Sequence, residues 1–369
     1  MTRSVLALVV LTVVLAACES GVAGPARARG TAEEIVVVTD SATWDGPVGE
    51  AIRAELAAPI PTLPGAQGAF RLRFQPLVPR LFEQLKMQPN LVFAAPIDAG
   101  GPIGEFVRAR AGEGNLDAIR SGQATGLIVR EDLWARDQRV VIATAGSDSA
   151  LAQAFLDRGP EMRTSFNVLA RERTTSEMFA RLRQTDLEQT LLDAHGFRVQ
   201  VQHDYVQVQD TAATVGDRTG AFVRYRRVLT DTWRDFFVFK QEGVEALPSL
   251  AELDVLTNGL LETFALGSFE DSFVQIDDQR PMASDTTTVA GRPALETRGL
   301  WYMTNDAMGG GFIRLAVVDR ATDTLYLYYG MTFAPDRRLD KRKFLRQMEA
   351  IGYTLRTEAD LQAESTSDA

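Results

Sequence analysis

Apolar and polar residues follow two different patterns along this chain, and the change falls near Gly196. Before Gly196, short continuous apolar runs typical of buried strands, such as residues 34–38 and 140–143, alternate with segments whose apolar residues recur at helical spacing. This alternation predicts an α/β layer over residues 33–194. We expect its last element to be an amphipathic helix over residues 174–194, followed by Gly196 at the C′ position.

Beyond this glycine, apolar residues alternate with polar ones, as they do in half-buried strands. Residues 197–240 contain several such strands, and the capping box of Ser249 and Glu252 opens a helix. A last helix is expected from Asp340 to Ile351, and the polar residues 268–295 predict a long loop or an excursion at the edge of a sheet. Three further apolar runs predict an antiparallel meander, at residues 300–303, 312–318 and 325–330.

The two patterns together predict an α+β protein. An N-terminal α/β half over residues 33–194 is followed by a C-terminal half, an antiparallel sheet flanked by helices, over residues 195–357; both halves have the size of ordinary domains. The order of elements in the second half also resembles the PsbP/Mog1-type sandwich, which implies that a C-terminal helix closes the sheet. Residues 358–369 predict a disordered acidic tail.

The first residues have the features of a secretory signal. Arg3 precedes an apolar run at residues 5–14, which is too short to span a bilayer. The sequence Leu15-Ala16-Ala17-Cys18 resembles the lipobox of bacterial lipoproteins, and this resemblance implies cleavage of a signal peptide, residues 1–17, and acylation of Cys18. An ordinary signal peptide with a chance cysteine is the alternative, but the chain has one cysteine and it occupies the lipobox position.

Residues 18–32 predict a flexible tether, because they are rich in Gly, Ala, Ser and Arg and show no apolar periodicity. A flexible segment of about 14 residues spans about 20 Å on average, so the folded body is expected close to its membrane. Glu19 stands where an aspartate signals inner-membrane retention in enteric bacteria, which favours the outer membrane. The membrane, reached through the acyl chains, is therefore one expected partner, and other proteins of the envelope are the second.

Composition narrows the classes of function. The 369 residues include 39 Lys and Arg against 49 Asp and Glu, a net charge of −10 with no basic block, which disfavours nucleic acid as a partner. One cysteine excludes a disulfide framework and a cysteine-rich metal site, and two histidines leave little for metal binding or a catalytic triad. We therefore expect no metal and no cofactor.

Candidate catalytic motifs are weak. Residues 146–150 (Gly-Ser-Asp-Ser-Ala) come nearest to a nucleophile elbow but lack both its central serine and its second glycine, and they read better as a helix N-cap. His195 and His203 are eight residues apart, at an expected helix end and an expected turn. The acidic pairs Glu270-Asp271 and Asp277-Asp278 lie in polar sequence and are interpreted as solvated loop charges. No catalytic residue is assigned.

One motif is a slightly stronger candidate for a binding site than those above. It consists of Gly309, Gly310 and Gly311, between two apolar runs. Three consecutive glycines permit positive φ angles or a close approach of two backbone segments, and their N–H groups can form an anion-binding nest. The site is therefore a candidate ligand loop. A turn or bulge without a ligand is the alternative, and it is the favoured one.

Several short fragments, in a fixed order across residues 33–355, resemble bacterial lipoproteins that carry the domain of unknown function 4837 (DUF4837). The family has no assigned activity, so this resemblance implies a lipoprotein of the cell envelope and lends no reaction. The matching fragments are residues 34–38, Trp44 with Gly46, Val48 and Gly49, Trp134 with Gln138, Val140 and Val141, residues 298–301, residues 310–312, and Ala334-Pro335 with Lys341, Arg342 and Leu345.

Taken together, these features favour a non-catalytic, lipid-anchored binding or assembly module of the cell envelope. Two alternatives stay open: an envelope hydrolase built from serine and carboxylate groups, and a solute-binding lipoprotein that serves a transporter. A hydrolase would turn over generic esters or glycosides, whereas a solute binder would gain thermal stability from its ligand.

Overall fold

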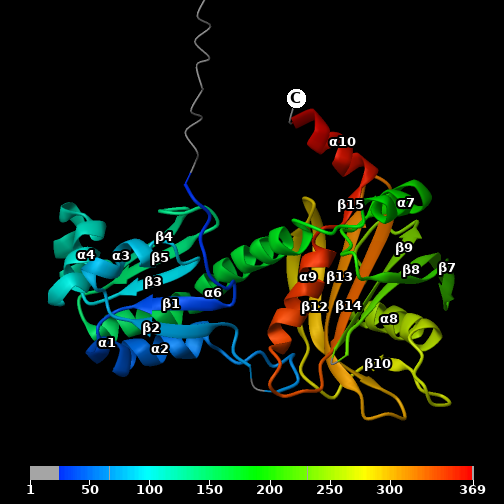
Figure 1. Ribbon diagram of the computed structural model, residues 1–369, viewed down its shortest axis with the longest axis horizontal. Helices are drawn as coiled ribbons and strands as arrows, with labels where there is room; N and C mark the ends of the chain where they lie inside the picture. The colour runs from blue at the N-terminus through cyan, green and yellow to red at the C-terminus, as the bar shows by residue number, and fades with distance from the viewer. Residues whose placement is uncertain (1–24, 66, 231, 368–369) are drawn as a thin grey trace, which may run out of the picture.

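The computed structural model describes residues 25–65, 67–230 and 232–367, and it shows two β-sheets joined by one long helix (Figure 1). The predicted signal peptide, residues 1–17, and the predicted acylation site Cys18 lie outside the described residues. Helices and strands are mixed in both halves, which confirms the α+β class. No helix in the described part of the chain combines the length and the apolar character that a membrane crossing requires.

The N-terminal half contains a five-stranded sheet in the order β2-β1-β3-β5-β4, parallel except for β4. Helices cover both faces, which explains the continuous apolar runs, because a strand buried on both faces needs apolar side chains on both. The strands are β1 (Glu34–Val38), β2 (Arg71–Gln75), β3 (Asn90–Ala94), β4 (Gly126–Glu131) and β5 (Arg139–Thr144). The shorter helices are α1 (Ser41–Asp45), α2 (Pro47–Leu56), α3 (Phe82–Leu85), α4 (Gly101–Ala111) and α5 (Leu116–Arg120).

The C-terminal half contains an eight-stranded antiparallel sheet in the order β10-β12-β13-β14-β9-β8-β7, with β11 paired to β12 beside this path. Its strands are β7 (Val206–Val215), β8 (Arg218–Val228), β9 (Trp233–Glu242), β10 (Val274–Ile276), β11 (Ala283–Val289), β12 (Arg292–Met303), β13 (Gly309–Asp319) and β14 (Thr324–Phe333). The predicted meander is confirmed as β12-β13-β14. A separate two-stranded pairing joins β6 (Phe197–Arg198) to β15 (Arg356–Thr357).

Helices cover the two faces of this sheet. On one face lies α8 (Leu250–Phe264), and the predicted capping box that opens it is confirmed: the Ser249 hydroxyl accepts from the Glu252 N–H, and the Glu252 carboxylate accepts from the Ser249 N–H. On the other face lies α9 (Lys341–Gly352), the predicted closing helix. Both faces of the sheet are therefore buried, and each has its own apolar core.

The prediction of a single helix over residues 174–194 is wrong, because the structure divides this segment between two helices. The 32-residue helix α6 (Asp148–Phe179) ends before it, and α7 (Thr185–His195) is a separate helix. Between them Leu182 adopts a positive φ of 57°, which interrupts the helical backbone. Helix α6 packs on α2 and on α9, so it bridges the two halves (Figure 1). A helix of this kind keeps polar residues on much of its surface, which hides its length in the sequence.

The halves also share apolar contacts. Leu63 of the N-terminal half, Met178 of α6 and Leu191 of α7 are buried in the core between the C-terminal sheet and α9. The domain boundary between residues 194 and 195 remains a prediction, although apolar side chains on its N-terminal side already pack on the C-terminal sheet.

The ends of the described chain are more ordered than predicted. The prediction of a flexible tether over residues 18–32 is wrong for its last part, which packs on the folded body. The N–H of Ala28 donates to the carbonyl of Arg136 at 2.9 Å, and Ala28 is 4% exposed. The prediction of a disordered tail over residues 358–369 is wrong for residues 358–367, which form the helix α10 (Glu358–Ser367). Its first turn is held because the Asp360 carboxylate accepts from Arg292 at 2.6 Å, a contact between segments far apart in the sequence.

Candidate functional site

A cleft of about 400 Å³ lies where the two halves meet, and we call it the junction cleft. Its walls come from the segment after α2 (residues 58–63), from one face of α6 (residues 163–171) and from β11 and β12 (residues 283–298). One face of α9 (residues 342–349) and Tyr353, which follows this helix, complete them. Because its walls come from both halves, the cleft exists only when the halves pack together.

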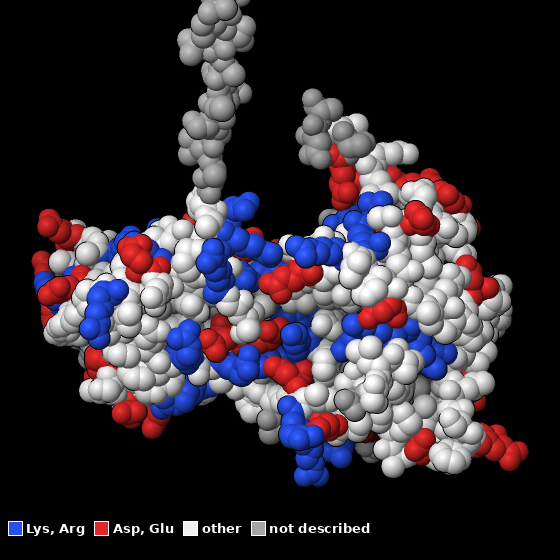
Figure 2. All heavy atoms as spheres, in the orientation of Figure 1, with Lys and Arg blue, Asp and Glu red and all other residues white. Residues whose placement is uncertain are grey.

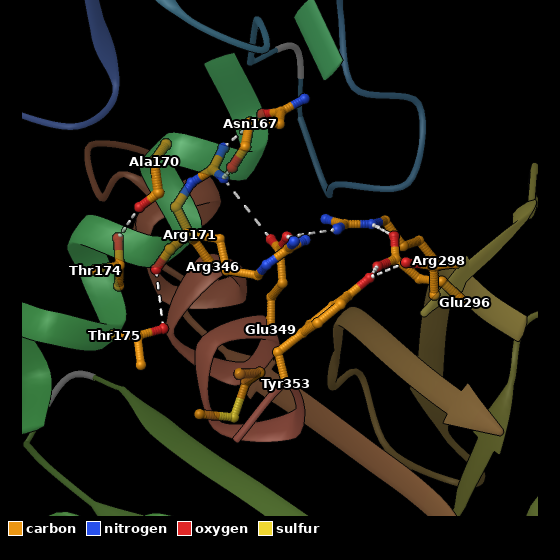
Figure 3. Close-up of polar contacts among 12 residues, drawn as sticks. Asn167, Ala170, Arg171, Thr174, Thr175, Glu296, Arg298, Arg346, Glu349 and Tyr353 are labelled. Atoms are coloured by element: carbon orange, nitrogen blue, oxygen red, sulfur yellow. Dashed lines mark hydrogen bonds and ion pairs between the residues drawn. The ribbon is translucent and has the colours of Figure 1, made fainter. Parts of the chain in front are cut away.

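The Glu349 carboxylate is the centre of the charge network in this cleft (Figure 3). Its Oε1 lies 3.2 Å from Arg171 Nη1 and 3.2 Å from Arg298 Nη2, and its Oε2 lies 3.8 Å from Arg346 Nη1. These three arginines come from α6, β12 and α9. One carboxylate on α9 therefore links the bridging helix to the C-terminal sheet.

Burial and charge act in opposite directions on Glu349, whose side chain is 2% exposed. Burial alone raises the pKa of a carboxyl group, because it disfavours the charged form. Here the guanidinium groups of Arg298, Arg346 and Arg171 outweigh burial, so the pKa of Glu349 lies below its ordinary value. Glu349 is thus ionised at neutral pH although water does not reach it.

A second layer of polar contacts orients these groups. Arg298 Nε donates to Glu296 Oε1 at 2.6 Å, and the Tyr353 hydroxyl donates to Glu296 Oε2 at 2.8 Å. The Arg171 guanidinium carbon lies 3.7 Å from the centre of the Tyr353 ring, a close cation–π contact. Burial and the nearby Glu296 carboxylate raise the pKa of the Tyr353 hydroxyl, which therefore stays protonated and donates.

Two buried arginines of α9 that line the cleft each retain a donor without a partner among the described residues. Arg346 Nη2 donates to Asn167 Oδ1 at 2.8 Å, and Arg342 Nη1 donates to the Gly68 carbonyl at 2.7 Å. Arg346 and Arg342 are 5% and 6% exposed, and the Nε of each is buried without a hydrogen-bond partner in the described chain. Such groups are costly to leave unsatisfied, because they have lost their bonds to water.

A second pocket of about 700 Å³ adjoins the junction cleft, and Arg171 and Tyr353 line both. Among the described residues, five arginines and three acidic residues line the junction cleft, and four arginines and two acidic residues line the second pocket. Each pocket therefore has two more arginines than acids, in a chain whose net charge is −10. Figure 2 shows basic side chains gathered, among acidic ones, along the middle of the molecule where the halves meet.

The three glycines predicted as a candidate ligand loop line neither pocket and form part of a strand, so that prediction is corrected. Gly309, Gly310 and Gly311 are the first residues of β13, and none of them has a positive φ. The turn that precedes β13 includes Asn305, whose φ is 57°. A Cβ atom added to Gly310 would lie 1.9 Å from the Thr332 carbonyl oxygen. Close approach of neighbouring strands therefore explains Gly310, and the alternating backbone of an anion nest is not formed there.

The remaining sequence candidates have structural surroundings. Ser147 caps α6 by accepting from the Ala150 N–H at 3.2 Å, as predicted. His195 ends α7, where its Nε2 lies 3.0 Å from Asp210 Oδ1, and Gly196 follows in the predicted left-handed conformation with φ of 72°. The described residues contain no group of three His, Cys, Asp or Glu side chains that could hold a metal ion.

Sequence reasoning missed the arginine network because its members lie far apart in the chain. The signal on α6 is the spacing of Arg163, Asn167 and Arg171 at intervals of four, and on α9 it is Arg342, Arg346 and Glu349. Such spacing places the side chains on one face of a helix, but a charged helical face is normally a solvated one. Nothing in the local sequence indicates that these two faces meet.

Two family models match the chain, and together they cover both halves. Residues 184–354 match a domain of unknown function (DUF4837), and residues 28–179 match another domain of unknown function (DUF8532). The C-terminal half therefore matches the DUF4837 family, which confirms the predicted resemblance over residues 184–354. The fragments quoted from the N-terminal half fall instead within the second model. No curated protein matches the chain.

Proposed function

We propose that this protein is a non-catalytic, lipid-anchored binding module of the cell envelope, and that the junction cleft binds a small anionic ligand. The observation that carries this proposal is the pair Arg342 and Arg346, buried in the wall of the cleft with unused Nε donors. The excess of arginine over acidic residues in both pockets supports the same ligand charge.

Arginine favours a carboxylate or phosphate ligand over other anions. Its planar guanidinium group presents five N–H donors in a fixed arrangement that matches two oxygens of such a group at once. In the junction cleft, Arg171 has one hydrogen bond to a carboxylate oxygen, to Glu349, so most of its donors remain available. A cleft of about 400 Å³ has the size of an ordinary small-molecule site, whose usual range is about 300–1,000 Å³.

A purely structural role for the network is the competing interpretation, and ligand binding separates the two. The mature protein is titrated with inorganic phosphate, citrate and glucose, while thermal unfolding and binding heat are measured. We expect phosphate or citrate to raise the melting temperature and glucose to leave it unchanged, because the neutral sugar lacks a group that pairs with arginine. At a ligand concentration of about 100 times Kd, the gain in stability is about 2.7 kcal/mol.

Arg171→Gln is the informative variant, because Arg171 lines both pockets while Glu349 keeps two other arginines. We expect it to weaken binding of phosphate or citrate about tenfold or more, which is about 1.4 kcal/mol. Arg338→Gln is the matched control, because the Arg338 side chain is 90% exposed and pairs with Asp336 outside the cleft. Equal affinities for both variants, or no effect of either anion on the wild type, would contradict the proposal.

The lipid anchor is a separate part of this proposal, and Cys18 tests it. The support is the lipobox-like sequence Leu15-Ala16-Ala17-Cys18. We expect intact-mass analysis of the protein from a bacterial envelope to show an acylated Cys18 at the N-terminus. Cys18→Ser is expected to stay unlipidated and to leave the membrane fraction. An unmodified cysteine in the wild-type protein would end this part of the proposal, without bearing on the junction cleft.

A further inference from the structure

Arg234 is a buried cation whose guanidinium group has no hydrogen-bond or ion-pair partner among the described residues. It lies near the start of β9, on the face of the sheet that α9 covers, and it is 4% exposed. Within the described residues, the Arg234 Nε is buried without a hydrogen-bond partner, and no guanidinium nitrogen of Arg234 forms an ion pair. The guanidinium group instead lies against the ring of Phe344, whose centre is 4.4 Å from the guanidinium carbon.

The other buried arginines show that this is an exception. Six arginines of the described chain are buried, and five of them lie within 4 Å of a carboxylate oxygen. Buried charges in proteins are normally paired, because an isolated charge removed from water is strongly destabilising. Burial, together with repulsion from Arg227, lowers the pKa of Arg234, because the attraction of Asp204 does not offset the loss of hydration.

The surroundings of Arg234 carry an excess of positive charge. Arg227 of β8 stands directly opposite Arg234 in the strand register, and like charges in this position repel each other. Arg227 pairs with Asp204 at 2.6 Å, so one acid serves two arginines. The hydroxyl of Tyr205, which interacts electrostatically with both arginines, is buried and also lacks a hydrogen-bond partner in the described chain.

We propose that Arg234, with Arg227 and the Tyr205 hydroxyl, binds a small oxyanion, a carboxylate or a phosphate, separate from the junction cleft. Such an anion supplies the missing counter-charge for Arg234 and reduces the repulsion between the two arginines. It also accepts a hydrogen bond from the Tyr205 hydroxyl, which burial keeps protonated by raising its pKa. One ligand therefore satisfies groups from β8, β9 and the segment that precedes β7.

Substitution of Arg234 by methionine tests this site in the full mature chain. Thermal unfolding is measured in acetate, in phosphate and in a buffer without either, all at constant ionic strength set with chloride. We expect acetate or phosphate to raise the melting temperature of the wild type in a saturable manner. Arg234→Met is expected to lose that part of the response, and to match or exceed the wild type in stability when the oxyanion is absent. A neutral, apolar side chain removes the unpaired charge, which explains this reversal of sign.

Two controls make the outcome specific. Arg226 lies on the adjacent strand β8 and pairs with Asp235 of β9, which keeps Arg224 as a partner when Arg226 is lost. Arg226→Met should therefore retain the oxyanion response. Arg171→Gln should lose binding in the junction cleft but keep the response that depends on Arg234. If Arg234→Met is less stable than the wild type by the same amount with and without oxyanion, the proposal is overturned.

A carboxylate of the chain itself is the remaining source of a counter-charge. Asp231, three residues before Arg234, lies outside the described residues. If Asp231→Asn and Arg234→Met have the same effect and the double variant adds nothing, the chain supplies the anion and the proposal fails. Additive effects, with the oxyanion response unchanged in Asp231→Asn, support a bound ligand. Arg234→Gln provides the same comparison if the methionine variant does not fold.

Discussion

Replacing Glu349 by alanine is expected to lower the free energy of unfolding by about 3–5 kcal/mol, the range for a buried ion pair that loses one partner. The substitution leaves Arg171, Arg298 and Arg346 without their shared carboxylate, at a position that water does not reach. It also releases the contact between α6 and α9, so the junction cleft is expected to open. Chemical denaturation followed by circular dichroism measures the change.

The control for this prediction is Glu161→Ala, on an exposed part of the same bridging helix. The Glu161 side chain is 65% exposed and pairs with Arg158, so its loss should change the stability by less than about 0.5 kcal/mol. A small effect of both substitutions would mean that the network does not hold the halves together. In that case the three arginines have other partners in solution, and the junction cleft described above is not the stable arrangement.

Acid should reproduce part of the Glu349→Ala effect. The folded pKa of Glu349 lies below its ordinary value of about 4.3, so the carboxylate adds stability above that pH. This stability is lost as the pH falls through the folded pKa, because the protonated group no longer balances the three arginines. Glu349→Gln should therefore be less stable than the wild type at neutral pH and lose less stability in acid. Parallel pH profiles of the two proteins would contradict this assignment.

The second large effect is expected from Gly310→Val. A Cβ at this position would lie 1.9 Å from the Thr332 carbonyl oxygen and 2.9 Å from Trp301 Nε1, two atoms that are hydrogen-bonded at 3.2 Å. The backbone of β14 and the buried Trp301 must both move. We therefore expect the free energy of unfolding to fall by more than about 3 kcal/mol, above the usual cost of overpacking. Thermal unfolding measures the loss of stability, and intrinsic tryptophan fluorescence, to which Trp301 contributes, reports the change in packing.

Gly114→Ala is the matched control, because a Cβ added to Gly114 has no atom within 4 Å and its φ is not positive. This substitution should leave the stability nearly unchanged. If Gly310→Val is as stable as the wild type, residues 309–311 do not form the first part of β13. The interpretation of these glycines as a loop would then be restored.

Local chemistry determined much of the architecture. The apolar runs at residues 34–38 and 140–143 became central strands of a sheet buried on both faces, because such strands need apolar side chains in both directions. The capping box at Ser249 and the left-handed Gly196 lie where predicted, since both depend on side-chain or backbone properties within one turn. These features are encoded over a few neighbouring residues.

Tertiary contacts determined the length and order of those elements whose local sequence signals conflict. Helix α6 continues through residues 157–173, where the buried Met162, Phe166 and Ala170 stand among many charged residues, and it packs on both α2 and α9. The segment after Pro25 and the acidic C-terminal helix are ordered by partners far away, at Arg136 and Arg292. Their sequences carry no apolar periodicity that could have predicted this order.

The candidate sites are formed entirely by tertiary contacts. Arg171, Arg298 and Glu349 are separated by more than fifty residues in sequence, and each has the pattern of a solvated charge. The fold brings them within hydrogen-bonding distance and removes the Glu349 carboxylate from water, which turns separate charges into one network around a buried acid. The sequence by itself determined the class of fold and the elements that form it. Only the packing of the two halves decided where its charges meet, because charge pairing depends on distance and burial, which no local pattern records.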